Sequence, residues 1–351
     1  MNALDLLVRG GRGSAGIPPY PATAQAWTRA EVEAQRDAVF LDVGDAVRGE
    51  IADAIAHIRS NGLDGATMEQ EDFRLPSFAP VAARMRAQLD AGFGLQVLRG
   101  LPVSLADEPA SEIIAWGLAN YLGRPIRQSL TRDRRLFTVT DKGGENGDPT
   151  RLGATNQTSR MHTDNGCLEP RPPCYLGLLC VSAARAGGNS TVISAASLHN
   201  AYLAERPDLL PLLFEPFHFL PPRLQAWPQG PRTVVKPIFE REGDAMHVHY
   251  ARVMVEPGME LAATPLSPRQ REALDVLDAL LERDDLVFDF RLKGGDFLFA
   301  NNLSTLHGRL AYTDDAPAAE AQRRCLKRVW MWRRHGGPGI DPVALDLAEL
   351  H

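Results

Sequence analysis

The chain has 351 residues, 44% hydrophobic and 23% charged, which is the balance of an ordinary globular protein. A formal net charge of −6 offers no clustered basic face for nucleic acid, and no apolar run approaches the roughly 18 residues of a membrane span. The N-terminus lacks a secretory signal pattern, and the four cysteines fit neither a disulfide framework nor a paired zinc pattern. We therefore expect a cytoplasmic protein with no nucleic-acid or membrane partner.

In chain order, residues 1–27 are rich in Gly, Pro and Ala and predict an irregular arm. Apolar spacing at the helical period predicts helices over residues 46–58, 80–89, 109–122, 195–205, 207–214 and 267–283. Short apolar or β-branched runs predict strands over residues 95–98, 135–139, 174–181, 191–193, 233–239, 246–253, 287–292, 297–300 and 324–332.

Predicted helices come first along the chain, and predicted strands are more frequent after them. This order favours a mainly β protein with helices (α+β). The pattern suits one large domain over residues 1–351, with a β-barrel or double-sheet jelly roll as its core. Residues 141–159 are long, polar and rich in Gly, Asn and Asp, so they predict a loop. An active-site lid and a plain surface excursion explain this loop equally well.

The short stretch at residues 159–166 indicates metal chemistry. His162 and Asp164 are two apart, so on an extended strand both side chains project from one face and can bind one metal ion. An ordinary buried pair is the alternative explanation of this spacing. His307 follows a tight turn and a buried strand and would supply a second imidazole. Two imidazoles and one carboxylate form the facial triad of non-heme Fe(II) oxygenases, which leaves iron positions open for a bidentate co-substrate and O2.

The last predicted strand offers an anchor for an acid. Period-two spacing places Arg324 and Arg328 on the same face as Trp330. The planar guanidinium fork of arginine pairs bidentately with a carboxylate, as a 2-oxo acid co-substrate would require. If the strand is turned the other way, both arginines instead lie in solvent.

Six short stretches, in order, resemble the taurine dioxygenase/clavaminate-synthase-like family of Fe(II)/2-oxoglutarate-dependent oxygenases. They are residues 98–102, 161–164, 175–180, 187–190, 295–309 and 323–330. The resemblance implies a double-stranded β-helix (jelly-roll) core over residues 95–333, with N-terminal and inserted helices.

The resemblance also implies roles for individual residues. His162, Asp164 and His307 would bind iron, and Arg324 and Ser190 would hold the C5 carboxylate of 2-oxoglutarate. Arg328 matches a position that holds the anionic end of the substrate in the taurine enzyme. The interval between His307 and Arg324 is longer here than in that enzyme. No catalytic residue beyond the iron ligands is expected.

The implied reaction uses O2 to hydroxylate an unactivated C–H bond of a small molecule, with decarboxylation of 2-oxoglutarate to succinate. Asp164 favours hydroxylation, because related halogenases leave that position open. Arg328 favours a carboxylate- or amino-acid-like substrate. The same cofactor chemistry can give desaturation, epoxidation or cyclisation in a biosynthetic pathway. A non-enzymatic jelly-roll binding protein is a further alternative, although Arg324 and Ser190 argue against it.

Three polar residues that lead into the metal strand are candidates for substrate contacts: Asn156, Gln157 and Arg160. Hydrogen bonding inside the loop explains them equally well. His247 and His249 form a second His-x-His, but Glu240 and Glu242 lack persuasive spacing for a metal site. Members of this family are often oligomeric, so a homo-oligomer is one expectation for this protein.

Overall fold

The computed structural model describes residues 17–21, 23–65, 67–126, 128, 135–142, 154–166, 172–221, 233–314 and 323–333. Most of the predicted N-terminal arm and most of the loop predicted at 141–159 lie outside the described residues. Within the described part of the chain, no helix is long and apolar enough to cross a membrane.

The larger β-sheet forms one wall of the core and has the strand order β1-β2-β14-β6-β17-β3, with β4 pairing on β17. Its strands are β1 (Phe40–Asp42), β2 (Leu95–Arg99), β14 (Phe297–Asn301), β6 (Tyr175–Ser182), β17 (Cys325–Arg333), β3 (Gly123–Ile126) and β4 (Phe137–Val139). β1 and β2 are parallel, whereas β17 runs antiparallel to β6, β3 and β4.

The smaller sheet is antiparallel and has the order β13-β8-β15-β5. Its strands are β13 (Phe288–Phe290), β8 (Ser190–Ser194), β15 (Thr305–Arg309) and β5 (Ser159–His162). Apolar side chains of both sheets share one buried cluster, in which Leu298 and Leu326 of the larger sheet meet Val192 and Phe288 of the smaller. Two such sheets packed face to face confirm the predicted jelly-roll core.

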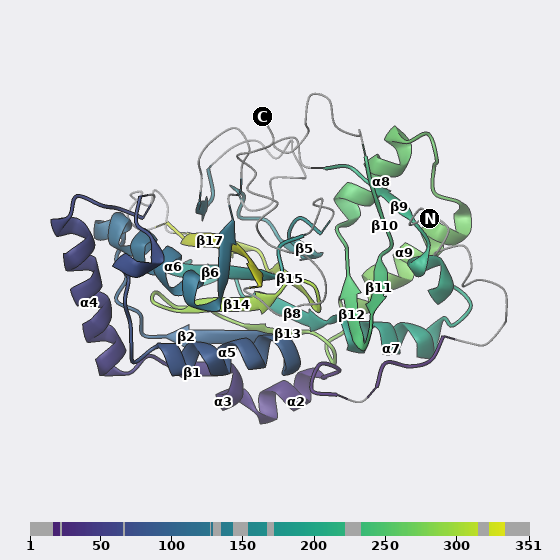
Figure 1. Ribbon diagram of the computed structural model, residues 1–351. Helices are drawn as coiled ribbons and strands as arrows, with labels where there is room; N and C mark the ends of the chain where they lie inside the picture. Colours follow the sequence, from purple (N-terminus) through teal and green to yellow (C-terminus); the bar gives the residue numbers. More distant parts are fainter. Residues whose placement is uncertain are drawn as a thin grey trace, which may run out of the picture.

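Helices cover the outer faces of both sheets (Figure 1). On the larger sheet, α4 (Asp45–Ser60), α5 (Ala79–Ala91) and α6 (Glu108–Leu122) form one apolar cluster with strand side chains such as Val329. An insertion covers the smaller sheet and packs on Ile193 and Leu306. It comprises α7 (Ala195–Glu205), η5 (Leu210–Phe214), β9 (Phe217–Phe219), β10 (Val234–Lys236), β11 (Phe239–Glu242), β12 (Ala245–Val248), α8 (Arg252–Leu261) and α9 (Pro268–Leu280).

The remaining elements are short and lie before α6. They are α2 (Arg29–Ala34), α3 (Arg36–Val39), η2 (Gln70–Asp72) and η3 (Leu105–Asp107). Two further short strands, β7 (Ala186–Gly187) and β16 (Tyr312–Thr313), pair with each other beside the smaller sheet's β8 and β15.

Two sequence predictions in the insertion were wrong. The helix predicted over 207–214 is a 3-10 turn at Leu210–Phe214. The strand predicted over 246–253 ends at Val248, and α8 begins at Arg252. The β-branched residues of this segment favour a strand locally, but tertiary contacts override them. A Cβ at Gly258 would lie 2.3 Å from the carbonyl oxygen of His218, so this glycine allows α8 to lie directly on β9.

Glycine also sets the approach of α6 to the preceding segment. A Cβ at Gly117 would lie 2.2 Å from the ring of Phe73, whereas a Cβ at Gly49 of α4 would meet nothing within 4 Å. We predict that Gly117→Ala lowers the free energy of unfolding by about 1–3 kcal/mol, because the buried ring must move. Gly49→Ala should raise it by about 0.5–1 kcal/mol, because alanine favours the helix. Urea unfolding checks both, and equal effects of the two changes would contradict the packing argument.

Candidate active site

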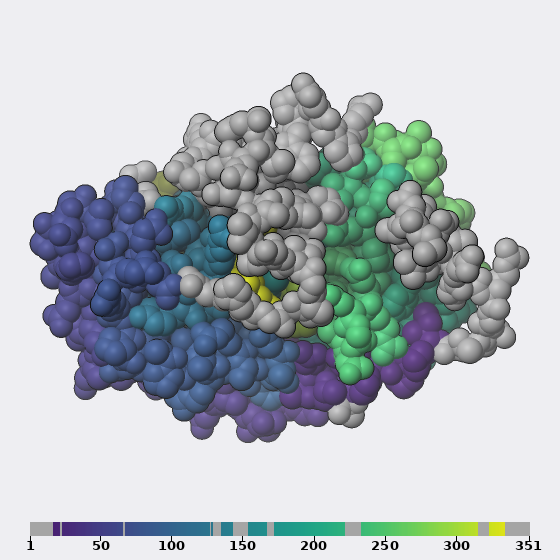
Figure 2. Space-filling view, in the orientation of Figure 1, coloured from purple at the N-terminus to yellow at the C-terminus, as the bar shows by residue number. Residues whose placement is uncertain are grey.

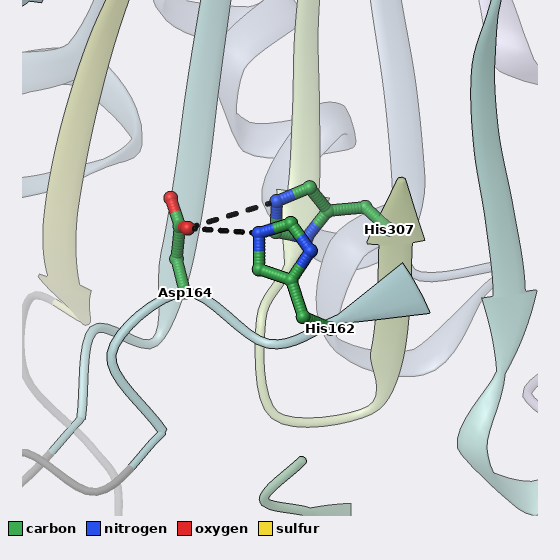
Figure 3. A group of neighbouring side chains, drawn as sticks. All are labelled: His162, Asp164 and His307. Atoms are coloured by element: carbon green, nitrogen blue, oxygen red, sulfur yellow. Dashed lines mark ion pairs between the residues drawn. The ribbon is translucent and has the colours of Figure 1, made fainter. Parts of the chain in front are cut away.

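Three side chains converge at one end of the smaller sheet (Figure 3). His162 on β5 and His307 on β15 face each other across the antiparallel pair, with ring centroids 4.4 Å apart. Asp164 Oδ1 lies 3.4 Å from His162 Nε2 and 3.8 Å from His307 Nε2. Among the described residues, these three form the one group of His, Cys, Asp or Glu whose ligand atoms lie close enough to hold a metal ion.

The route by which Asp164 reaches the histidines differs from the prediction. The sequence argument placed His162 and Asp164 on one strand, but β5 ends at His162 and Asp164 lies in the turn that follows. The next residue, Asn165, has a φ of 51°, in the left-handed region that asparagine tolerates better than most residues. The turn, rather than strand alternation, therefore brings the carboxylate to the imidazoles.

The donor set fits a divalent metal ion. The carbonyl of Arg160 can only accept, so His162 Nδ1 carries the proton in their 2.8 Å hydrogen bond and Nε2 faces Asp164 with a free lone pair. Burial and the neighbouring His162 lower the pKa of His307 to about 3, which keeps its imidazole neutral. The three ligand atoms all lie within 4.8 Å of one another, which is close enough for one ion to contact all of them.

The two oxygens of the Asp164 carboxylate contact side chains of different sheets. While Oδ1 faces the histidines, Oδ2 accepts hydrogen bonds from Arg328 Nη1 at 3.1 Å and from Trp330 Nε1 at 2.8 Å. Burial alone would raise the pKa of Asp164, but the positive charge of Arg328 outweighs it and, with smaller contributions from His162 and His307, holds the pKa well below its usual range. The group is therefore ionised, as a metal ligand must be.

Backbone hydrogen bonds hold the turn that carries Asp164. The side chain of Asn302, in the β14–β15 turn, accepts from the Asp164 N–H and donates to the Asp164 carbonyl, each at 2.8 Å. Thr163 N donates to the carbonyl of Tyr250, and Tyr250 N donates to Thr163 Oγ1. Sequence analysis missed Asn302 and Tyr250, because their role depends on contacts between distant segments.

A cationic pocket lies beside the other end of β15. Arg324 is buried and stacks on the ring of Tyr312 at 5.1 Å. Within the described part of the chain, Arg324 Nη1 and the Tyr312 hydroxyl are buried without a hydrogen-bond partner. Burial lowers the pKa of Arg324, although Tyr312 opposes that shift. Since buried polar groups are normally paired, the two donors indicate a bound anion.

Two further features shape this pocket. Gly187 and Gly188 both have a φ of +71°, which favours glycine, and a Cβ at Gly187 would lie 2.4 Å from the carbonyl oxygen of Ala311. Ser190, the next predicted ligand of the acid, is buried and begins β8 directly after this turn. The structure therefore brings the Gly-Gly turn and both predicted anion ligands to the same end of the smaller sheet.

Sequence analysis missed a second cation here, Arg309. It stacks on the same Tyr312 ring at 4.7 Å and pairs with Ser190 across β15 and β8. Burial and the nearby Arg324 lower the pKa of Arg309 to about 10. It also donates to the carbonyls of Thr155 and Gln157. The period-two spacing from His307 is the sequence signal that could have found it.

The candidate substrate residues fall into two groups. Arg328 faces the metal centre and is 20% exposed, which excludes the alternative of a strand turned to solvent. The side chains of Asn156 and Gln157 hydrogen-bond to each other. The backbone carbonyl of Asn156 accepts from Tyr312 N, and that of Gln157 accepts from the Arg309 guanidinium. Arg160 is exposed on β5, and its carbonyl orients His162. Substrate contacts by these last three side chains stay predictions.

The second His-x-His serves the fold. His249 Nε2 pairs with Glu240 at 2.9 Å, and His247 Nδ1 lies 3.5 Å from Glu242 across the same hairpin. These pairs do not come together as a metal-binding group among the described residues. Both histidines are buried, and His249 Cα lies close to Gly166 in the turn that carries Asp164.

Comparison with known proteins shows relatives along most of the chain. FR-33289 synthase of Streptomyces rubellomurinus is 28% identical over 316 residues, covering 89% of this chain and 90% of that protein. A uridine-5'-phosphate dioxygenase of a Streptomyces species is 30% identical over 199 residues, which cover 55% of this chain and 70% of that protein.

Solved structures share the fold. Asparagine oxygenase, solved with Fe(II), 3-hydroxyasparagine and succinate, has a TM-score of 0.65 at 19% identity and covers 83% of this chain and 93% of that chain. The non-heme iron oxygenase OrfP, solved with Fe and alpha-ketoglutaric acid, has a TM-score of 0.62 at 16% identity over 83% and 93% of the two chains.

The family model described as "Taurine catabolism dioxygenase TauD, TfdA family" matches residues 59–330. Because this match spans well over half of the sequence, the chain belongs to the TauD, TfdA family of non-heme iron dioxygenases, which use Fe(II) and 2-oxoglutarate.

Proposed function

We propose that this protein hydroxylates an unactivated C–H bond of a small carboxylate- or amino-acid-like substrate. In this proposal His162, Asp164 and His307 hold Fe(II), and 2-oxoglutarate is decarboxylated to succinate. The supporting observation is the pairing of two sites on β15: the metal-ligand cluster at His307 and the cationic pocket beside Arg309. Two residues of a strand span about 7 Å, a separation that a five-carbon diacid bridges.

The chain's own groups then have separate tasks. The buried donors Arg324 Nη1 and Tyr312 Oη face the C5 carboxylate, and Ser190 at the start of β8 is a third donor. Iron, when bound, supplies the oxidising chemistry with O2 and the 2-oxo acid. His162 is 25% exposed, whereas Asp164 and His307 are nearly fully buried, so the site opens toward substrate on the His162 side. Figure 2 shows yellow atoms from the C-terminal part of the described chain between the blue N-terminal part and the green insertion.

Arg328 supports the proposed substrate class. Its Nη1 and Nε atoms bond Asp164 and Gln128, and among the described residues its Nη2 atom has no hydrogen-bond partner. A guanidinium with an unused N–H edge beside the metal centre suits an anionic group on the substrate. Asparagine and arginine derivatives are bound in the solved relatives, and uridine 5'-phosphate is named for another relative.

Succinate release tests this function. Protein loaded with Fe(II) and given 2-oxoglutarate is screened against amino acids, small carboxylates and nucleoside phosphates, with product mass measured. We expect one substrate group to release succinate with a gain of one oxygen atom. A loss of two hydrogens would instead show desaturation or ring closure.

Two substituted proteins are tested in the same succinate screen. His162→Ala should lose metal binding and turnover, whereas His57→Ala, on the exposed face of α4, should keep both. Turnover that survives in His162→Ala, or iron-loaded protein that releases no succinate with any substrate, would overturn the proposal.

The co-substrate pocket gives a second prediction. Arg324→Lys should raise the KM for 2-oxoglutarate by about 10- to 100-fold, because lysine cannot reproduce the planar fork at a charged acceptor. Metal affinity measured without 2-oxoglutarate should stay unchanged. Arg291→Lys is the matched control, since Arg291 is exposed and donates to the carbonyls of Ala184 and Arg185 near the same turn. An unchanged KM in Arg324→Lys would show that the acid binds elsewhere.

A further inference from the structure

Trp330 is a buried tryptophan whose indole N–H is directed at a proposed iron ligand. It is 5% exposed and lies on β17 between Leu176 of β6 and Ile126 of β3, with which it forms a small apolar cluster. Its strand is therefore paired on both sides, with β6 and with the edge strand β3. Its Nε1 donates to Asp164 Oδ2 at 2.8 Å in a site screened from water. A hydrogen bond to a charged acceptor is strong in such surroundings.

Arg328 supplies a second donor to the same oxygen. Its guanidinium lies 4.4 Å from the Trp330 ring and 4.9 Å from the Phe137 ring. Gln128 Oε1 accepts from Arg328 Nε at 2.9 Å, and Gln128 Nε2 donates to the Arg328 carbonyl at 2.7 Å. The two donors to Asp164 thus belong to one packed unit of the larger sheet.

We infer that Trp330 is a positioning residue which, with Arg328, restricts Asp164 to binding the metal through Oδ1 alone. A carboxylate can bind a metal ion with one oxygen or with both. With Oδ2 occupied by two donors from the opposite sheet, rotation of Asp164 toward two-oxygen binding would break both hydrogen bonds. One-oxygen binding leaves three positions on an octahedral ion, which a bidentate 2-oxo acid and O2 together require. A carboxylate bound through both oxygens would leave only two.

This inference rests on the proposed iron site, and it gives Arg328 a structural task beside its proposed contact with substrate. The two tasks use different atoms, because Nη1 bonds to Asp164 and the proposed substrate contact uses Nη2. Substitution of Trp330 removes one donor to Asp164 without removing the cation, so it tests the positioning role apart from substrate binding.

The experiment compares Trp330→Phe with Trp332→Phe on the same strand. Phenylalanine keeps an aromatic ring but removes the N–H. The indole nitrogen of Trp332 has no hydrogen-bond partner among the described residues, so Trp332→Phe is the matched control. Co(II) serves as the probe, because its visible absorption reports the number of ligands and needs no turnover.

We expect Trp330→Phe to weaken Co(II) binding about 10-fold or more, since groups that orient metal ligands typically contribute 10- to 100-fold to affinity. Its Co(II) absorption should also change in shape, because Asp164 gains the freedom to bind through both oxygens. Trp332→Phe should bind Co(II) as the wild type does and show the same spectrum.

The outcomes separate the two proposals. Failure of the wild-type protein to bind Co(II) would overturn the iron site and the inference together. A wild-type site with unchanged affinity and spectrum in Trp330→Phe would overturn the inference alone. Should Trp330→Phe not fold, Arg328→Gln removes the other donor to the same oxygen. It should give the same spectral change, and an unchanged spectrum would count against the positioning role.

Discussion

The carboxylate of Asp164 connects the two sheets of the jelly roll, and the arrangement of the site depends on it. Oδ1 meets the histidines of the smaller sheet, while Oδ2 accepts from Arg328 and Trp330 of the larger sheet. A buried carboxylate without partners would be costly, so these contacts also explain why the charge is tolerated at this depth. One side chain therefore joins the histidines of the smaller sheet to the hydrogen-bond donors of the larger sheet.

The surrounding structure keeps this carboxylate in place from three directions. Asn302 holds the Asp164 backbone from the β14–β15 turn, and Tyr250 holds Thr163 from the inserted segment. Gln128 fixes Arg328 from beyond β3. Since these partners come from widely separated parts of the chain, the metal ligands become pre-arranged only when the whole core has folded. This is the expected design for a site that must leave positions open on its metal ion.

A second constraint is the cationic pocket at the other end of β15. Two buried guanidinium groups, Arg309 and Arg324, stack on the one ring of Tyr312. Such a cluster of like charges is unfavourable by itself and becomes favourable when an anion binds between its donors. The Gly187–Gly188 turn lies directly against the segment that carries Tyr312, because a side chain at Gly187 would meet the backbone of Ala311 and Tyr312. The smaller sheet thus carries the candidate metal ligand His307 and the cationic residue Arg309 two residues apart on one strand.

The sequence by itself determined the type of chemistry. His162, Asp164 and His307 were identifiable from residue type and spacing, Arg324 and Ser190 from family resemblance, and the shared face of Arg324, Arg328 and Trp330 from period-two alternation. Most helices were predictable within a few residues, because their apolar periodicity is a local property. Tertiary structure decided the rest. It brought Asp164 to the histidines through a turn, and it formed α8 in a segment where the sequence predicted no helix. It also directed Trp330 and Arg328 onto the Asp164 carboxylate and Asn302 onto the Asp164 backbone. These features depend on contacts between segments far apart in the chain, and such contacts leave no local pattern in the sequence.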